Sequence, residues 1–302
     1  MSQHGLHGAG SALNEATLYV VATPIGNLRD VTLRALDVLH GADVIACEDT
    51  RVTAKLLARY ELSKRLVALN QHNEQAGARR IVALLGQRRT VAYVSDAGTP
   101  GVSDPGARLV AAVRAAGHAV VAVPGPNAAL AAYSVAGLDC PRLLIYGFLP
   151  AQAAARRREL EALRPLPYAL ALHEAPHRIV ACARDLADAL GAGRSVVLAR
   201  ELTKLFETVH ACRLGELAGW LEADANRQRG EFVMIVDRAA DAPAGDAAEA
   251  QRLLALLLDE LPLNQAVKLA AKLSGQPRNR LYELALAVRG ERADPVHPVE
   301  AE

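Results

Sequence analysis

The sequence of 302 residues lacks the long apolar runs that mark membrane proteins. No stretch approaches the roughly 20 consecutive apolar residues that a helix needs to cross a bilayer. Residues 1–16 have neither a basic start nor an apolar core, so we expect a disordered tail there and no signal peptide. These absences predict that a membrane is not a partner of this protein.

The sequence also lacks closely spaced cysteine pairs and a large net charge. The four cysteines, Cys47, Cys140, Cys182 and Cys212, are scattered and include no CxxC pair. This spacing predicts a cytoplasmic protein with reduced, mostly buried thiols. The formal net charge is only +1, which argues against a protein that simply coats RNA with a basic surface. A local basic patch remains compatible with this balance.

Most of the sequence consists of apolar segments that alternate with amphipathic segments. The chain is 51% hydrophobic and 22% charged, and its length predicts two globular domains with a small addition. The apolar runs are almost continuous, which is typical of strands buried on both faces in parallel or mixed sheets. The alternation predicts an α/β fold. The expected strands are 17–22, 43–47, 90–95, 118–124, 142–148, 168–173, 195–200 and 231–237.

Helix-start signals lie between these strands. Asn27 is expected to cap a helix that runs through Val38. Asp104, followed by Pro105, is expected to cap a second helix that Gly117 ends. From these signals and from composition, we expect the following division of the chain: an N-terminal α/β domain (17–127), a second α/β domain (128–238), a linker (239–247), a C-terminal helical domain (248–290) and a disordered tail (291–302).

The C-terminal region predicts three helices, at 248–260, 263–273 and 278–289. The SGQP break before the third helix permits a helix-turn-helix, whose basic side chains would meet RNA phosphates. The alternative is a small helical cap or dimer element with solvated basic residues. The basic side chains in question are Lys268, Lys272, Arg278 and Arg280.

Polar loops rich in glycine and proline follow six of the expected strands, and ligands bind beyond the carboxyl ends of strands in open α/β sheets. Six such loops predict one shared cleft. In the stretch VSDAGTPGVSDPG (94–106), Gly98 and Gly101 let the backbone approach a ligand closely. Asp96 stands at the strand end, where it would accept hydrogen bonds from a ribose or an amino group; a purely structural role is the alternative.

Nine short motifs together resemble the tetrapyrrole-methylase superfamily. Within it, they are similar to the branch that methylates the ribose 2′-oxygen of a cytidine in the decoding centre of small-subunit (16S) rRNA. The resemblance spans roughly residues 17–288, and EDTR, RELTK and the helical end favour the rRNA branch over enzymes of porphyrin precursors. The motifs are TPIGNL (23–28), EDTR (48–51), SDAGTPG (95–101), SDPG (103–106), PGPNAA (124–129), GFLP (147–150), EAPHR (174–178), RELTK (200–204) and GEF (230–232).

The resemblance implies two α/β domains with S-adenosylmethionine in the cleft between them, no metal, a homodimer, and 16S rRNA or the small ribosomal subunit as partner. Three places depart from the family pattern: AYSVAGL (132–138) stands where a serine-glycine pair is expected, Asn127 replaces a smaller residue, and LHEAPHR replaces an aromatic-glutamate-serine form. Carried over position by position, the cofactor-binding residues would be Pro24, Gly26, Asp96, Ala97, Gly98, Val102, Pro124, Gly125, Asn127, Ala128 and Phe148.

Methyl transfer from a sulfonium is an in-line displacement, so positioning supplies most of the rate. A ribose hydroxyl also needs a group that shifts its proton. Glu48 and Asp49 are candidate bases, Arg51 and Lys204 candidate phosphate clamps, and Glu207 a further acceptor. The alternative is that these charges form salt bridges that hold the loops, and no single base is singled out. Arg178 and Arg200 are further candidates for RNA binding.

The sequence HEAPH (173–177) matches the HExxH pattern of zinc proteases, but that pattern requires a helix. Pro176 disfavours helical backbone before it, and an apolar strand precedes it, so we expect no zinc site. Three function classes remain: an rRNA 2′-O-methyltransferase, a methyltransferase of a small tetrapyrrole-like substrate, and a non-catalytic RNA-binding assembly factor. The helical end argues against the second class, and the six-loop cleft argues against the third.

Overall fold

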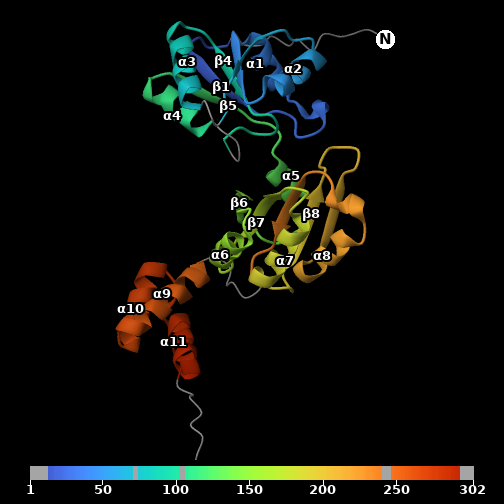
Figure 1. Cartoon of the computed structure of the whole chain (residues 1–302). Coiled ribbons are helices and arrows are strands. Elements are labelled where there is room, and N and C mark those ends of the chain that lie inside the picture. Colours follow the sequence, from blue (N-terminus) through green and yellow to red (C-terminus); the bar gives the residue numbers. More distant parts are fainter. Residues whose placement is uncertain (1–12, 71–73, 102–105, 240–245, 293–302) are drawn as a thin grey trace, which may run out of the picture.

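The computed structural model describes residues 13–70, 74–101, 106–239 and 246–292. Figure 1 shows three parts in succession: an N-terminal sheet with its helices, a second sheet with its helices, and a group of three helices. The residues Val102, Asp104 and Pro105 lie outside the described residues. So do most of the expected linker and of both expected tails.

The N-terminal unit contains a sheet of five parallel strands in the order β3-β2-β4-β1-β5. Both β2 and β4 are buried along their whole length, as their continuous apolar sequences predict. One hydrophobic cluster lies on each face of the sheet. The strands are β1 (Thr17–Val21), β2 (Val44–Cys47), β3 (Arg65–Ala68), β4 (Val91–Val94) and β5 (Ala119–Val123).

The helices of this unit are η1 (Leu28–Asp30), α1 (Leu33–Gly41), α2 (Thr50–Arg59), α3 (Glu74–Gly86) and α4 (Ala107–Ala115). The prediction of one helix capped by Asn27 and running through Val38 is wrong. The Asn27 side chain accepts from the Arg29 N–H and caps only the short η1. The backbone is extended at Val31 and Thr32, and the Thr32 hydroxyl then caps α1.

The second unit is a mixed sheet in the order β6-β7-β10-β8-β9. Strands β6 and β7 are parallel, whereas β10 lies antiparallel between β7 and β8, and β9 is antiparallel to β8. Its elements are α5 (Ala128–Ser134), β6 (Leu143–Phe148), α6 (Ala153–Leu163), β7 (Ala169–Glu174), α7 (Ile179–Leu190), β8 (Ser195–Arg200), β9 (Thr208–Arg213), α8 (Leu214–Glu222), η2 (Ala225–Gln228) and β10 (Phe232–Val236).

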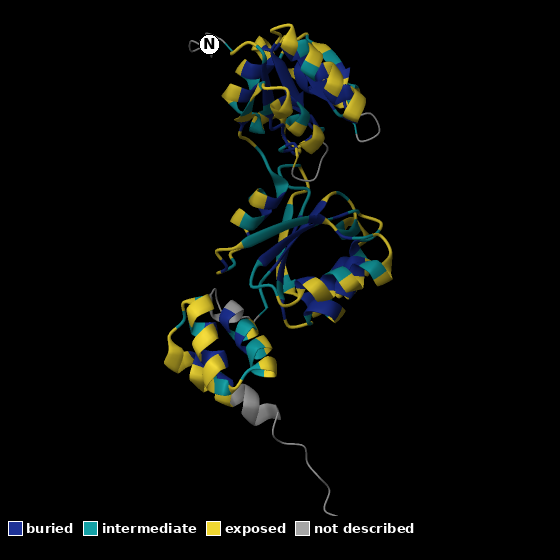
Figure 2. Cartoon of the chain, turned by 90° about the vertical axis from the view of Figure 1, so that its left-hand side faces the viewer, coloured by how far each residue is buried: buried dark blue, intermediate teal, exposed yellow. Residues whose placement is uncertain are grey.

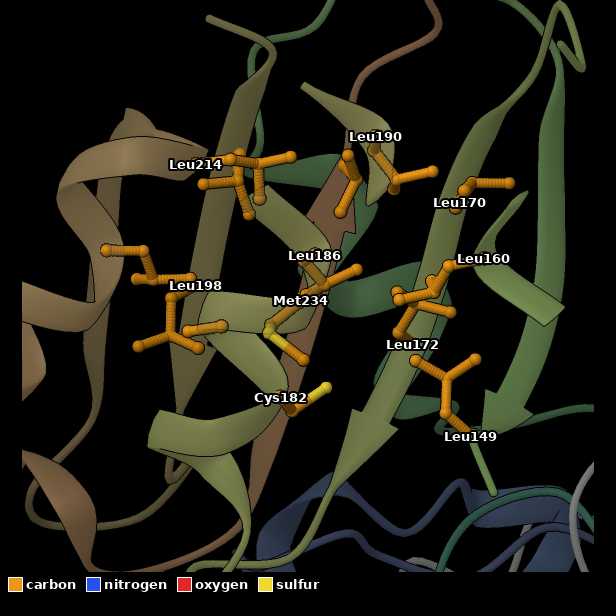
Figure 3. Close-up of a cluster of buried hydrophobic side chains, with 14 of the residues drawn as sticks. Leu149, Leu160, Leu170, Leu172, Cys182, Leu186, Leu190, Leu198, Leu214 and Met234 are labelled. Carbon is orange, nitrogen blue, oxygen red and sulfur yellow. The ribbon is translucent and has the colours of Figure 1, made fainter. Parts of the chain in front are cut away.

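Two cores cover the faces of the second sheet. On one face, side chains of β7, β8 and β10 such as Leu172, Leu198 and Met234 meet Leu186 of α7 (Figure 3). On the other face, the small residues of α5, among them Ala132, pack on the sheet. The central strands β7, β10 and β8 are accordingly mostly dark blue, the colour of buried residues, in Figure 2. This burial keeps the strand ends in place, and the loops of the candidate site extend from those ends.

All eight predicted strands are present, with ends within one residue of the expected ones, but β3 and β9 were not predicted. Both are edge strands. In β9 half-buried and exposed residues alternate, so no continuous apolar run announces it.

The three expected C-terminal helices are α9 (Asp246–Glu260), α10 (Leu263–Ser274) and α11 (Arg278–Arg292). They enclose a hydrophobic cluster of their own, to which Leu254, Val267 and Leu281 contribute. Gly275 ends α10 in the left-handed conformation, with φ +68°. Over the described ranges, no helix combines the length and the apolar character that crossing a membrane requires.

Candidate active site

A cavity of about 500 Å³ lies where loops of the two sheets meet. The N-terminal unit contributes the loops after β1, β2 and β4. The second unit contributes the start of α5, the ends of β6, β7 and β8, the turn after β8, and the start of β10. The volume falls within the range of about 300 to 1,000 Å³ that is usual for small-molecule sites. The cavity is therefore the shared cleft that the six polar loops predict.

Six of the predicted cofactor residues line this cavity: Asp96, Ala97, Gly98, Asn127, Ala128 and Phe148. One oxygen of the Asp96 carboxylate accepts the Asp49 N–H at 2.9 Å, which fixes the loop after β2 against the loop after β4. The backbone of Gly98, at φ +78°, exchanges two hydrogen bonds with Thr23, of 2.9 and 3.0 Å. This left-handed conformation favours glycine.

Four other predicted cofactor residues, Pro24, Gly26, Pro124 and Gly125, are not among the residues that line the cavity. Gly125 packs against Ala22 at the end of β1. Gly26 lies against the second unit, because a Cβ there would stand 2.6 Å from Cγ of Lys204. The next residue, Asn27, donates its N–H to the Thr203 hydroxyl at 3.0 Å. Ile25 of the same loop does line the cavity, so the TPIGN loop borders the cavity and also contacts the second unit.

The EDTR residues separate into a cavity residue and a helix-capping pair. Glu48 lines the cavity. Asp49 is the N-cap of α2, and its carboxylate pairs with Arg51 at 2.6 Å. The hydrogen bonds from Arg51 lower the pKa of Asp49 to about 2, so this carboxylate is an anion and a weak base at neutral pH. Arg51 itself is exposed.

The RELTK residues form a compact charge network. The Lys204 ammonium donates to Glu201 at 2.9 Å and lies 3.1 Å from Glu231, which lines the cavity. Burial alone would lower the pKa of Lys204, but the hydrogen bonds to these two carboxylates outweigh it and raise the pKa. Glu207 accepts the Thr203 N–H. Lys204 is therefore a charged residue that links Glu201 to Glu231 beside the cavity, and Glu207 stabilises the turn through its hydrogen bond.

Arg178 and Arg200, two of the residues predicted to bind RNA, hold protein oxygens in this structure. Arg178 donates to Glu174 at 2.9 Å and to the Leu149 carbonyl at 2.8 Å. Arg200 donates to the carbonyls of Arg229 at 2.7 Å and Phe206 at 3.1 Å. Each guanidinium thus fixes a loop next to the site.

A buried arginine, Arg156, holds the loop that follows Phe148. Arg156 pairs with Asp185 at 2.5 Å, and only 4% of either side chain is exposed. The same guanidinium donates to the carbonyls of Pro150 and Ala151, at 3.3 and 3.1 Å. Hydrogen bonds to backbone carbonyls therefore hold the GFLP loop in place: Arg156 binds those of Pro150 and Ala151, and Arg178 binds that of Leu149.

Sequence reasoning considered His173 only as a zinc ligand and so missed its place in the cavity wall. His173 lies near the end of β7, and its ring centroid is 5.5 Å from that of Phe148. Burial lowers the pKa of His173, so the imidazole is neutral near pH 7. His177 follows in the turn before α7, so the two histidines do not share a helix. Across the described residues no cluster of three metal-binding side chains occurs.

The sequence also gave no individual prediction for several other wall residues, among them Ile25, Thr99, Leu202 and Val233. Their positions directly beside the polar loops were the available signal. The basic residues predicted to bind RNA at the C-terminal end are all exposed. They lie on α10 (Lys268 and Lys272) and on α11 (Arg278 and Arg280).

Comparison with protein families gives two matches. Residues 17–218 match the tetrapyrrole (corrin/porphyrin) methylases, and residues 244–289 match the RsmI C-terminal HTH domain. Among solved structures, the fold is similar to uroporphyrin-III-C-methyltransferase from Thermus thermophilus. The TM-score is 0.54 at 24% identity, over 74% of this chain and 95% of that one.

Curated relatives are similar over almost the whole chain. The ribosomal RNA small subunit methyltransferase I of Escherichia coli O157:H7 is 47% identical, over 92% of this chain and 97% of the relative. The protein of the same name from Xylella fastidiosa (strain Temecula1) is 49% identical, over 88% of this chain and 97% of the relative. This chain belongs to the tetrapyrrole methylase family and, within it, to the ribosomal RNA small subunit methyltransferase I family.

Proposed function

We propose that this protein is an S-adenosylmethionine-dependent methyltransferase that modifies the ribose 2′-hydroxyl of a cytidine in the decoding centre of 16S rRNA. The relatives named above support an rRNA substrate. The observation that carries the proposal is the cavity between the sheets, with Asp96, Phe148 and Glu48 in its wall. The cytidine and its 2′-oxygen come from the motif resemblance described above.

The residues of the cavity fit the cofactor. The volume suits a molecule of nucleoside size. Asp96, at the end of β4, faces the cavity as an acceptor for a ribose or amino group, and Gly98 offers backbone without a side chain. Glu48, Glu174 and Glu231 add carboxylates to the wall, and Arg178 and Lys204 pair with the last two. Carboxylate oxygens in a partly closed site favour a cationic sulfonium.

When bound, S-adenosylmethionine supplies the methyl group for an in-line displacement. The protein contributes chiefly by positioning, since a correctly held acceptor gains much of the rate without acid–base help. The loops after β2, β4, β6 and β7 are tied by the hydrogen bonds described above, so the wall is formed before substrate enters. Asp49 is too weak a base, so of the two EDTR carboxylates we propose Glu48, which lines the cavity, as the acceptor of the ribose proton.

The positive groups near the cavity have a separate role in this proposal. Lys204 holds the RELTK turn against Glu231. Arg51 is exposed and pairs with Asp49. We propose that Arg51 exchanges this carboxylate for an RNA phosphate when the substrate binds. The basic residues of α10 and α11 are proposed as a second contact to RNA phosphates. A cytoplasmic location and a homodimer belong to the same proposal.

The proposal is tested with tritiated S-adenosylmethionine and three acceptors: undermethylated small ribosomal subunits, naked 16S rRNA and a tetrapyrrole precursor. Label is expected in RNA, at a cytidine 2′-oxygen after nuclease digestion and chromatography. Label in the tetrapyrrole would favour the small-substrate alternative. Cofactor binding without label in any acceptor would contradict the proposal. A variant with Asp96→Ala serves as control, since it should bind cofactor weakly.

A further inference from the structure

The turn between β8 and β9, residues 201–207, exposes two large apolar side chains. Leu205 is 89% exposed and Phe206 is 66% exposed. They stand side by side in the sequence, directly after Lys204. Contiguous exposed apolar surface is typical of interaction sites.

The turn is held rigidly. Glu201 and Thr203 have positive φ, +52° and +65°, a conformation that costs free energy and persists only where the surroundings enforce it. Glu201 accepts from Lys204 and from the Glu231 N–H, both at 2.9 Å. Arg200 also holds the Phe206 carbonyl. A preorganised turn loses little entropy when a partner binds.

The inside of the same turn forms the cavity wall. Leu202 lines the cavity, and so does Glu231, to which Lys204 is bound. Phe206 follows Leu202 by four residues and is turned to solvent. A nucleotide whose sugar enters the cavity would therefore bring its neighbour in the strand to the outer side of this turn.

The charge around the turn complements a nucleic acid. Arg200 donates, within the described part of the chain, to carbonyl and hydroxyl oxygens and forms no ion pair. The side chain of Arg229, whose carbonyl accepts from Arg200, is exposed. Three acidic groups lie at this turn, and each has a partner: Glu207 accepts the Thr203 N–H, whereas Glu201 and Glu231 pair with Lys204. Exposed aromatic rings next to arginines are typical of surfaces that bind single-stranded RNA.

From these contacts we infer that Phe206 stacks on the base next to the target nucleotide, while Arg200 and Arg229 meet the adjoining phosphates. The inference rests on the proposed rRNA substrate and extends it to a named recognition surface. The occupant is single-stranded RNA. A second copy of the chain on the same surface is the rival outcome that the experiment separates.

The test compares Phe206→Ala, Phe206→Leu and Phe206→Trp with the wild-type protein. Binding is measured by anisotropy with an oligoribonucleotide of the decoding-centre sequence that carries 2-aminopurine beside the target cytidine. Stacking on one aromatic ring predicts about tenfold weaker binding and loss of 2-aminopurine quenching for both Ala and Leu variants. The Trp variant should restore both, because an indole also stacks.

Leu33→Ala is the matched control, because Leu33 is 61% exposed on α1 and outside the proposed surface. It should bind RNA as the wild type does, and all variants should keep cofactor affinity in calorimetry. Wild-type binding by Phe206→Leu would overturn the inference, since an apolar contact without stacking would then suffice. A dimer that dissociates in Phe206→Ala, seen by light scattering, would also overturn it in favour of a second copy. Failure of the wild-type protein to methylate any RNA would instead reject the proposed function.

Discussion

At the scale of single residues, neighbouring groups of the same type have different surroundings. Glu48 and Asp49 are adjacent, but only Glu48 lines the cavity. The Asp49 carboxylate is engaged by the Arg51 side chain and backbone. The chemistry of a carboxylate therefore depends on what its loop places beside it, and residue type alone does not decide it.

Glu48→Gln should lower turnover about 10²-fold or more, the usual contribution of a positioned base. Asp49→Asn should have a much smaller effect on turnover, and it should leave the pH dependence of the rate unchanged above pH 4. The reason is that the pKa of Asp49 is about 2, so this group does not titrate in that range. Single-turnover rates from pH 5 to 9 check this, with cofactor affinity measured separately. Equal losses in the two variants would contradict the assignment.

Loss of the buried Asp185 carboxylate should strongly lower the stability of the second unit. Burial alone would raise its pKa, but hydrogen bonds from Arg157 and Arg156 outweigh it and lower the pKa. Asp185→Asn leaves the buried Arg156 without its counter-charge, which costs about 3 to 5 kcal/mol. Urea unfolding measures this, with Glu222→Gln as control. Glu222 pairs with Arg184 at the surface, and such pairs contribute about 0 to 1 kcal/mol.

The same pair predicts a pH dependence. A carboxylate with a lowered folded pKa stabilises the protein above its unfolded pKa of about 3.9. That stabilisation is lost as the pH falls through the lower pKa that Asp185 has in the folded protein. The difference in unfolding free energy between wild type and Asp185→Asn should therefore shrink below pH 4. A difference that stays constant down to pH 2.5 would show that the charge of Asp185 contributes nothing.

At the scale of elements, strands buried on both faces were predictable, because their apolar runs carry the signal. The edge strands β3 and β9 were not predictable, because their half-exposed residues form no continuous apolar run and only a weak alternation of apolar and polar side chains. The cavity was predictable from loop positions at strand ends, and six of its predicted cofactor residues line it. The role of Gly26 was not predictable, because its partner Lys204 lies far away in the sequence and in the other unit.

Gly26→Ala should separate the TPIGN and RELTK loops. A Cβ at this position would lie 2.6 Å from Lys204 Cγ and 3.0 Å from the Leu202 carbonyl, and the latter backbone atom cannot move alone. Cofactor affinity and turnover should both fall about tenfold or more, since small displacements of positioned groups are costly. Calorimetry and rate measurements check this. Gly219→Ala is the control, because a Cβ there meets nothing within 4 Å; equal affinity for both variants would contradict the loop-contact role.

At the scale of the whole molecule, the three parts have separate cores. The cavity is formed by the first two, whereas the C-terminal helices supply exposed basic residues to a surface of their own. We therefore expect the first two units to bind the cofactor and the C-terminal helices to contribute to binding of a large substrate. Changes on α10 and α11 should accordingly alter RNA affinity and leave the cavity intact.

Replacing Lys268, Lys272, Arg278 and Arg280 together by glutamine tests this division. Each lost phosphate contact reduces the slope of log affinity against log salt by about 0.7 to 0.9, so four contacts give about 3 to 4. Anisotropy at several salt concentrations measures the slope, and cofactor affinity should be unchanged. Arg79→Gln with Arg80→Gln, two exposed positions on α3, is the control. An unchanged slope in the quadruple variant would assign the helices to the cap or dimer alternative.

The position of β10 has a consequence for biosynthesis. This strand comes last in the second sheet, yet it lies between β7 and β8. A nascent chain that has not emerged beyond Val236 leaves both neighbours with unpaired backbone, which invites aggregation. The first sheet is complete by Val123, so it is able to fold during translation while the second awaits its central strand. Premature termination shortly before Phe232 should thus yield a half-folded, insoluble product, with no partially competent enzyme.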